Sequence, residues 1–153
     1  FANNIPCDSI STLESMAYNF LSTDCIVCAV MDARCSQVYN ALFEIKNGVV
    51  TRLCDDRALS LNDLKNELLS VDGRIIIAGY GTDITCKYIG NEIKNAESAP
   101  VNLKYQRASS TALVAFKMIN NGQTVSAQEL MPVYLRLPQA QRELNKKLGG
   151  RTK

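Results

Sequence analysis

The stretch CIVCAVMDARCSQVYNALFEI, residues 25–45, decides the fold of this chain. Residues 26–31 are six apolar residues rich in β-branched side chains, which is typical of a strand buried on both faces. After a break at residues 32–34, residues 38–45 alternate with a period of two, and this predicts a second strand. Asn47-Gly48 favours a tight hairpin that leads into a third strand over residues 49–54. The stretch therefore predicts a three-stranded antiparallel meander.

Helical spacing and capping residues predict the elements on either side of the meander. The predicted elements are, in chain order, a short strand at 5–10, a helix at 12–22, the three meander strands, a helix after Ser60, a central strand at 74–78, a helix at 83–94, a short strand at 101–103, a helix at 108–120, an extended segment at 131–136 and a polar helix at 139–148. Capping boxes are expected at Ser11 with Glu14 and at Ser126 with Glu129.

This element order predicts an α/β fold with a mixed sheet, in which parallel strands extend the meander and helices cover both faces. It is the order of a ribonuclease H-like half-domain, the unit that is doubled in actin-like ATPases (the ASKHA fold). In the helix at 108–120, the residues expected to be buried are Ala112, Ala115, Phe116 and Ile119.

Length and composition limit the class of protein. At 153 residues the chain has the length of one domain. Hydrophobic residues make up 46% and charged residues 21%, which are ordinary values for an ordered globular domain. No apolar run approaches the ~20 residues of a membrane helix, and no basic and apolar leader is present. These features predict a soluble, cytoplasmic protein.

Six cysteines and the absence of histidine limit the chemistry. Four of the cysteines lie in or beside apolar runs, where a reduced cysteine acts as a small hydrophobic residue. Cys25 and Cys28 have the spacing of a redox pair, but positions three apart on a strand face opposite sides. We therefore expect structural thiols rather than a redox, zinc or disulfide site. Without histidine, the chain lacks the commonest general base and metal ligand.

Charge is distributed unevenly along the chain. Residues 1–95 hold 8 Lys and Arg against 12 Asp and Glu, whereas residues 96–153 hold 9 against 3. A basic C-terminal third is compatible with RNA contact, and also with a solvated surface or an acidic protein partner. The sequence leaves these alternatives open.

The fold class suggests a two-metal nuclease, which the acidic residues disfavour. Such enzymes gather carboxylates around the metals, typically with one acid inside the first strand. Here Asp32 ends its strand, and Asp55 and Asp56 follow a different element. We expect a turn at Asp32 and a solvated loop at Asp55 and Asp56.

The segment Gly79-Tyr80-Gly81-Thr82-Asp83 has the position of a phosphate-binding loop between a strand and a helix. It lacks a lysine and a third glycine, and Asp83 places negative charge where phosphate would bind. We interpret it as a tight turn that Thr82 or Asp83 caps.

Several short motifs occur in a fixed order: Ile10-Ser11-Thr12-Leu13-Glu14, Met31-Asp32-Ala33-Arg34, Arg107-Ala108-Ser109-Ser110 and Pro132-Val133-Tyr134-Leu135-Arg136. Together they extend over nearly the whole chain. In order and spacing the chain resembles the C-terminal half of the bacterial TsaB (YeaZ) family, which takes part in threonylcarbamoyladenosine modification of tRNA. The family's first-lobe motifs, an early Asp-Thr-Ser strand and a glycine-rich stretch, do not occur in this sequence.

The resemblance implies that residues 1–137 form the second lobe of an actin-like ATPase fold. Residues 1–10 would be the junction from a missing first lobe, and residues 138–153 a basic C-terminal helix and tail. It also implies a non-catalytic scaffold for the catalytic subunit TsaD, which modifies adenosine 37 of tRNA, with TsaE as an ATPase partner. In the family, the contact with TsaD is mainly through the first lobe.

The resemblance implies neither a cofactor nor a metal, and no membrane. The sequence leaves open weak or indirect tRNA contact and a homodimer as further partner states. The alternative function is a nucleotide-dependent enzyme lobe, either a kinase-like ATPase or a glycoprotease-like peptidase of the M22 type. We expect no catalytic residue in this chain.

For partner contact we expect two places: Asp32 with Arg34 in one loop, and Tyr134 with Arg136 in the C-terminal segment. These are exposed-type side chains beside rigid strands. The alternative is structural, in which Arg34 or Arg136 forms an ion pair with Asp32 or Asp55.

Overall fold

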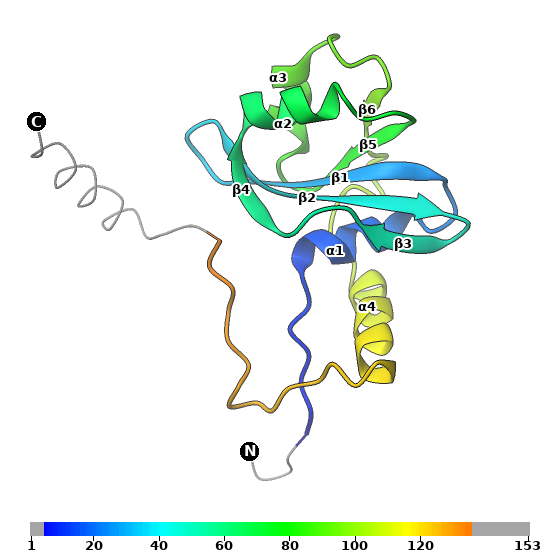
Figure 1. Ribbon diagram of the computed structural model, residues 1–153, viewed down its shortest axis with the longest axis vertical. Coiled ribbons are helices and arrows are strands. Elements are labelled where there is room, and N and C mark those ends of the chain that lie inside the picture. The colour runs from blue at the N-terminus through cyan, green and yellow to red at the C-terminus, as the bar shows by residue number, and fades with distance from the viewer. Residues whose placement is uncertain (1–4, 136–153) are drawn as a thin grey trace, which may run out of the picture.

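The structure is a computed structural model that describes residues 5–135 (Figure 1). Its strands are β1 (Cys25–Asp32), β2 (Gln37–Lys46), β3 (Val49–Arg52), β4 (Arg57–Ser60), β5 (Ile75–Ala78) and β6 (Ala96–Ser98). Its helices are α1 (Thr12–Ala17), the 3-10 helix η1 (Tyr18–Phe20), α2 (Leu61–Leu68), α3 (Thr82–Ile89) and α4 (Ala108–Asn120). None of the described helices is long and apolar enough to cross a bilayer.

The six strands form one mixed sheet in the order β3-β2-β1-β5-β6, and β4 pairs with the part of β2 that β3 leaves free. The strands β1, β2 and β3 are antiparallel neighbours, with Cys25 opposite Ile45 in β2. The strand β5 lies parallel to β1, with Ile26 opposite Ile75. The predicted meander and the predicted central strand are therefore confirmed.

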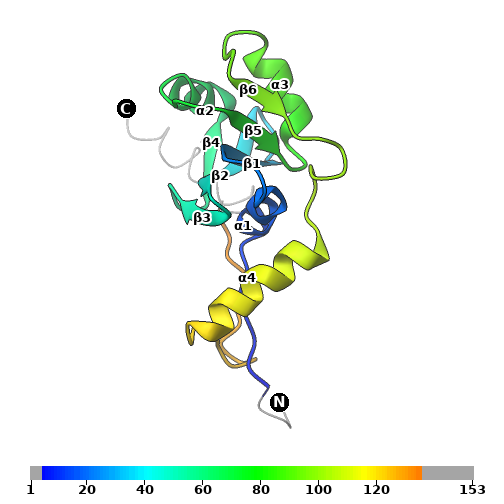
Figure 2. The same ribbon diagram turned by 90° about the vertical axis from the view of Figure 1, so that its right-hand side faces the viewer.

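Helices cover the two faces of the sheet, and each face has its own core (Figures 1 and 2). On one face, Met16 and Phe20 from α1 and η1 pack with Phe43 of β2. On the other face, Leu64 of α2 packs with Ile77 of β5. Strand β1 contributes to both cores, because alternate residues point to opposite faces.

The helix α4 has the predicted bounds, but its predicted buried face is wrong. Figure 2 shows α4 below α1, on the side of α1 that faces away from the sheet. Phe116 is 66% exposed and Ile119 is 54% exposed, Ala112 is exposed and Ala115 is half-buried. The buried residues of α4 are instead Ser110 and Val114. The apolar stripe that we assigned to the core faces outward, because α4 packs on a short helix rather than on the sheet.

Several predicted bounds are also corrected. The predicted strand at 5–10 is reduced to a single bridge between Cys7 and Val125. The first helix changes to 3-10 geometry after Ala17, and α3 ends at Ile89 because Gly90 has a positive φ of 58°. The short edge strand lies at Ala96–Ser98 rather than at 101–103, and β4 was not predicted. Residues 138–153, including the predicted helix at 139–148, lie outside the described residues.

Candidate partner-binding groove

A groove of about 460 Å³ lies beside the start of α1. Residues 9–13 form one wall, Met31 of β1 and Tyr39 of β2 contribute from the sheet, and residues 132–135 form the opposite rim. Met31 and Tyr39 lie directly opposite each other in the antiparallel pairing of β1 and β2. The lining combines hydroxyl groups with apolar side chains, so it suits an extended peptide better than a charged ligand.

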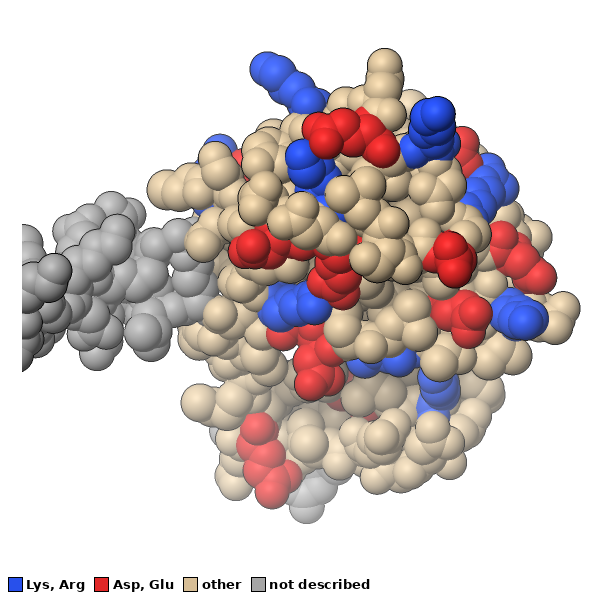
Figure 3. Space-filling view, turned by 45° about the horizontal axis from the view of Figure 1, so that its top comes forward, with Lys and Arg blue, Asp and Glu red and all other residues tan. Residues whose placement is uncertain are grey.

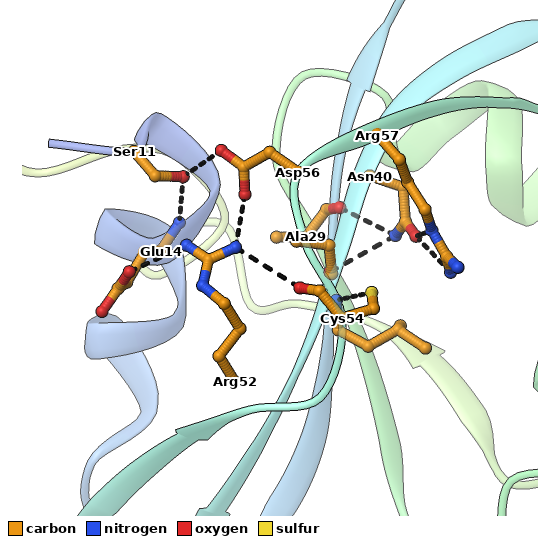
Figure 4. A network of polar contacts seen from close by, with 10 residues as sticks. Ser11, Glu14, Ala29, Asn40, Arg52, Cys54, Asp56 and Arg57 are labelled. Atoms are coloured by element: carbon orange, nitrogen blue, oxygen red, sulfur yellow. Dashed lines mark hydrogen bonds and ion pairs between the residues drawn. The ribbon is translucent and has the colours of Figure 1, made fainter. Parts of the chain in front are cut away.

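The start of α1 is fixed by a polar network that joins it to the segment between β3 and β4 (Figure 4). The Ser11 hydroxyl accepts the Glu14 N–H at 3.2 Å and donates to Asp56 Oδ2 at 2.5 Å. Arg52 donates to Asp56 Oδ1 at 2.5 Å and to Glu14 Oε2 at 2.8 Å. Only the Ser11 half of the predicted capping box is seen, because Glu14 pairs with Arg52.

Arg52 is the centre of this network. Burial disfavours its charge, but hydrogen bonds from Arg52 to Asp56 and Glu14 outweigh that effect and raise its pKa. Its guanidinium carbon also lies 4.8 Å from the centre of the Phe43 ring. Asp56 lines the groove, yet both of its carboxylate oxygens are engaged. Asp56 is therefore held by Ser11 and Arg52, and neither of its oxygens is left without a partner.

The expectation of a solvated loop at Asp55 and Asp56 is thus wrong for Asp56. The sequence placed Ser11 correctly at a helix start, but it gave no sign that Asp56 reaches this residue across 45 positions of chain. Tyr39 was also missed as a groove residue. The strand register would have located it, because in a meander with Cys25 opposite Ile45, Tyr39 must lie opposite Met31.

A second polar network lies under the other face of the sheet (Figure 4). Asn40 is fully buried, and its side-chain nitrogen donates to the carbonyl of Ala29 at 3.0 Å. Its side-chain oxygen accepts from Arg57 Nη2 at 3.1 Å, and Arg57 also donates to Glu67 at 2.6 Å. These bonds satisfy a buried amide and join β2 to β4 and α2, so they support the sheet beneath the groove.

The predicted contact residues Asp32 and Arg34 lie in the turn between β1 and β2. Arg34, Cys35 and Ser36 all have positive φ values, of 65°, 54° and 56°. Asp32 Oδ1 accepts the Arg34 N–H at 2.7 Å, and the Arg34 guanidinium lies 3.4 Å from Asp32 Oδ2. The ion pair given as the structural alternative is present, although the Arg34 side chain is 86% exposed. Asp32 therefore shapes the turn that displays Arg34.

Tyr134 lines the groove, on the rim opposite the start of α1. It is 83% exposed, and Val133 beside it is 75% exposed, so this rim is not packed into the groove. Met31, the residue before Asp32, lines the same groove, which brings the two predicted places to one end of the sheet. Arg136 lies outside the described residues.

The glycines of the segment at 79–83 serve packing. Gly79 has a φ of 112°, and a Cβ added there would collide with the carbonyl oxygen of Val30 in β1. The Thr82 hydroxyl donates to the Gly79 carbonyl at 2.7 Å, and Asp83 pairs with Lys104 Nζ at 2.6 Å. The geometry is that of a tight turn between β5 and α3. The predicted cap by Thr82 or Asp83 is corrected, since Gly81 occupies the cap position and no side chain caps the helix.

All six cysteines are free thiols. Cys25 belongs to one core and Cys28 to the other, as expected for positions three apart on a strand. Burial raises the pKa of both thiols, and most strongly that of Cys28. Within residues 5–135, no three Cys, Asp or Glu side chains gather in a way that could hold a metal ion.

The excess of positive charge lies mostly beyond the described part of the chain. Between residues 96 and 135 the basic side chains are Lys104, Arg107 and Lys117, against Glu97 and Glu129. Lys104 Nζ donates a hydrogen bond to Asp83 Oδ1, and this bond raises the pKa of Lys104. On the face seen in Figure 3, acidic and basic side chains are interspersed. The expected RNA contact by a basic C-terminal third thus depends largely on residues 136–153.

Comparisons with known proteins identify one similar sequence and two similar structures. No protein-family model matches the chain. A curated protein of Bacillus subtilis, tRNA threonylcarbamoyladenosine biosynthesis protein TsaB, is 26% identical over 138 residues, which is 90% of this chain and 59% of that protein. The chain therefore spans about three fifths of the length of this relative.

Two solved structures from Pseudomonas aeruginosa have a similar fold. One is described as an uncharacterized protein with similarity to peptidase YEAZ, with a TM-score of 0.70 and 20% identity over 88% of this chain and 61% of that one. The other is YeaZ, with a TM-score of 0.69 and the same identity and coverage. These likenesses confirm the predicted fold class, a mixed sheet of the ribonuclease H-like, actin-like type. The resemblance to the TsaB (YeaZ) family that the sequence motifs predicted is thereby confirmed over most of this chain.

Proposed function

We propose that this chain acts in the biosynthesis of threonylcarbamoyladenosine at position 37 of tRNA, as a non-catalytic partner of a TsaD-type catalytic subunit. The observation that carries the proposal is the alignment of 138 residues with a protein named for this pathway. The similarity extends over 90% of this chain rather than over one isolated motif. The chain spans 59% of that relative, so it supplies part of what the longer protein contains.

The chemistry of the residues supports a binding role. The sequence has no histidine, so the usual base for a serine or cysteine nucleophile is missing. Cys28 is fully buried, and burial raises the pKa of its thiol, which disfavours the thiolate that a nucleophile requires. The acid that lines the groove is already paired with Arg52 and Ser11. What the groove offers is shape, hydroxyl groups and apolar side chains, which are the means of recognising a peptide.

The contact surface in this proposal is the groove rim with Tyr134, together with the turn that displays Arg34. Tyr134 offers a large side chain that combines an apolar ring with a hydroxyl group, which is typical of residues that dominate binding energy. Arg34 offers a guanidinium that is 86% exposed on a turn fixed by Asp32. Binding of a TsaE-type ATPase and contact with tRNA belong to the same proposal, and the basic residues at 136–153 are the place for tRNA.

Reconstitution tests this function. The full 153-residue chain, a TsaD-type subunit, a TsaE-type subunit and unmodified tRNA are combined with threonylcarbamoyl-adenylate, and the modified nucleoside is measured by mass spectrometry. We expect product only when the TsaD-type subunit is present, and more product when this chain is added. Product formed by this chain alone, or an unchanged yield when it is added, would contradict the proposal.

A matched pair of variants tests the contact surface. Tyr134 and Val101 are both 83% exposed, but only Tyr134 lines the groove. We expect Tyr134→Ala to weaken binding of the TsaD-type subunit on the order of 10-fold or more, as for a central aromatic contact. Val101→Ala should leave this binding unchanged.

Titration of this chain with ATP and magnesium distinguishes the non-catalytic partner from the alternative, a nucleotide-dependent enzyme lobe. Micromolar binding by this chain alone would favour the enzyme lobe.

A further inference from the structure

Two exposed tyrosines form a ring pair at the carboxyl end of the parallel strands. Tyr80 follows β5 and Tyr105 follows β6, and the centres of their rings lie 4.8 Å apart, with an angle of 36° between the ring planes. Tyr80 is 62% exposed and Tyr105 is 38% exposed. The tyrosine pair therefore presents aromatic surface to solvent, and an aromatic face of this kind is available for stacking.

The tyrosine pair lies where the chain changes from one face of the sheet to the other. After β5 the chain enters α3, which packs on the same face as α2, whereas after β6 it passes to α4, on the side of α1 (Figure 2). When the connections after two adjacent parallel strands leave to opposite faces, an opening forms at the carboxyl ends of the strands, and open α/β sheets bind ligands there. The tyrosine pair has one ring from each of these two connections.

Hydrogen bonds fix the backbone that carries both rings. The Gly79 N–H donates to the carbonyl of Lys104 at 2.7 Å, which joins the two segments that hold the tyrosines. The Asn19 side-chain nitrogen donates to the carbonyls of Leu103 and Tyr105, at 2.7 Å and 2.9 Å. The tyrosine pair is thus preformed, so a ligand that stacks on it has little backbone to order.

The charges beside the tyrosine pair favour an anionic ligand. Residues 98–128 contain three basic residues and no Asp or Glu. Arg107, two residues after Tyr105, is exposed, and its guanidinium forms no hydrogen bond or ion pair in the part of the chain that the structure describes. Asp83, the acid that contacts this segment, is paired with Lys104 at 2.6 Å. A free guanidinium near exposed rings suits a phosphate and the base attached to it.

We infer that the tyrosine pair binds single-stranded RNA, with an unpaired base stacked on the exposed ring of Tyr80 and a neighbouring phosphate bound by Arg107. Proteins recognise RNA in this way at loops and ends, whose bases are free to stack on aromatic side chains. The identity of the RNA rests on the proposed function, which points to an unpaired loop of a tRNA. The site adds a base contact to the tRNA contact proposed for residues 136–153.

Fluorescence anisotropy tests the base contact. The full 153-residue chain is titrated into a labelled single-stranded RNA of about ten nucleotides at low salt. We expect Tyr80→Ala to raise the dissociation constant on the order of 10-fold, and Tyr80→Phe, which keeps the ring, to leave it within about 2-fold of the original. Circular dichroism checks that Tyr80→Ala is folded, as expected for a residue that is 62% exposed.

Tyr88 provides the matched control. It is 42% exposed and also lies beside a lysine, since Lys65 Nζ is 5.8 Å from its ring centre, but it does not belong to the ring pair. Tyr88→Ala should therefore leave the dissociation constant for the RNA unchanged. An equal loss for Tyr80→Ala and Tyr88→Ala would overturn the site.

Salt dependence tests the phosphate contact. Arg107→Gln removes one cation, so the slope of log affinity against log salt concentration should become shallower by about 0.7 to 1. Lys94→Gln is the control, because Lys94 is exposed but lies before β6, at the opposite end of the parallel strands. It should leave the slope unchanged, and an unchanged slope for Arg107→Gln would remove Arg107 from the site.

A fluorescent reporter detects stacking directly. The chain contains no tryptophan, so Tyr80→Trp places a single tryptophan in the ring pair. We expect the labelled RNA's unlabelled form to quench the emission of Tyr80→Trp, because a base stacks on the indole, and to leave the emission of Tyr88→Trp unchanged. If ATP quenches Tyr80→Trp and the RNA does not, the ligand is a free nucleotide and the RNA site is wrong.

Two further outcomes overturn the RNA site: RNA binding that Tyr80→Ala leaves unchanged, and double-stranded RNA that binds as tightly as single-stranded RNA, since paired bases cannot stack on a side chain. These assays contain no TsaD-type subunit, so their outcome is separate from the reconstitution. A chain that binds RNA through Tyr80 but does not raise the yield of modified nucleoside contradicts the proposed function alone. A chain that raises the yield but does not bind the RNA contradicts the RNA site alone.

Discussion

The strand β1 and the helix α4 were both predicted from apolar residues, yet they have opposite surroundings. In β1, residues 27–30 are buried as predicted, because α1 covers one face of the sheet and α2 and α3 cover the other, whereas Ile26 and Met31 are half-buried. In α4, the bounds are as predicted, but Phe116 and Ile119 point outward. The comparison teaches that a hydrophobic period determines local structure, whereas burial depends on what the rest of the molecule places beside it.

Two phenylalanines provide the largest test of this contrast. Phe43 is fully buried between α1 and Arg52, so Phe43→Ala should lower the free energy of unfolding by about 3–5 kcal/mol. Phe116→Ala should change it by less than about 0.5 kcal/mol. Urea unfolding measures both. A comparable loss for Phe116→Ala would show that α4 is packed against other parts of the same chain.

Two glycines separate close packing from backbone conformation. Gly79 and Gly73 both have positive φ, but only Gly79 approaches another backbone, that of Val30. Gly73→Ala should cost about 1 kcal/mol, which is the strain of positive φ. Gly79→Ala should cost at least about 2 kcal/mol more, because β5 or β1 must shift. Equal losses of unfolding free energy would mean that the contact between these strands is looser than described.

Two arginines compare an ion pair inside a network with one at the surface. Arg52 is 29% exposed and bonds with Glu14 and Asp56, so Arg52→Met should cost about 1–3 kcal/mol. Arg34 is 86% exposed, and Arg34→Met should change stability by less than about 0.5 kcal/mol. Thermal unfolding of both variants measures the difference. A small effect at Arg52 would indicate that the start of α1 is held by packing alone.

The smallest expected effect on stability comes from the capping box in the segment that follows α4. The backbone N–H and the hydroxyl of Ser126 both donate to Glu129 Oε2, so the predicted capping box is confirmed. These hydrogen bonds lower the pKa of Glu129. A lowered pKa means that this box contributes stability above the usual value of 4.5, and loses it as the pH falls through the folded value. Ser126→Ala removes the hydroxyl bond and should raise the pKa of Glu129. An NMR titration of its carboxyl carbon detects this, and an unchanged value would mean that the box does not form.

The correct predictions share a physical basis, since they depend on neighbours close in sequence. The meander follows from the alternation at residues 38–45 and the turn at Asn47-Gly48, whose φ values of 51° and 74° are of the expected sign. The helix α2 follows from Ser60, which accepts the Asp63 N–H. In each case the determining contacts lie within a few residues.

The missed features depend on contacts that are distant in sequence. The network at the groove joins Ser11 to Asp56, and the fourth strand exists because residues 57–60 pair with the start of β2. The sequence of β4 carries no period of its own that distinguishes it from a loop. The groove was located only in part for the same reason: Tyr134 was identified, whereas Tyr39 and Met31 join it through the sheet register.

The placement of the cysteines has a consequence for measuring the motions of this protein. Cys35 lies exposed on a turn, whereas Cys28 lies fully buried in the middle of β1, where its thiol resists ionisation. An alkylating reagent reaches the first thiol in the native state and the second only after the sheet has come apart. One chain thus holds both a reference and a reporter, and the ratio of their labelling rates gives the frequency of global opening without any added probe.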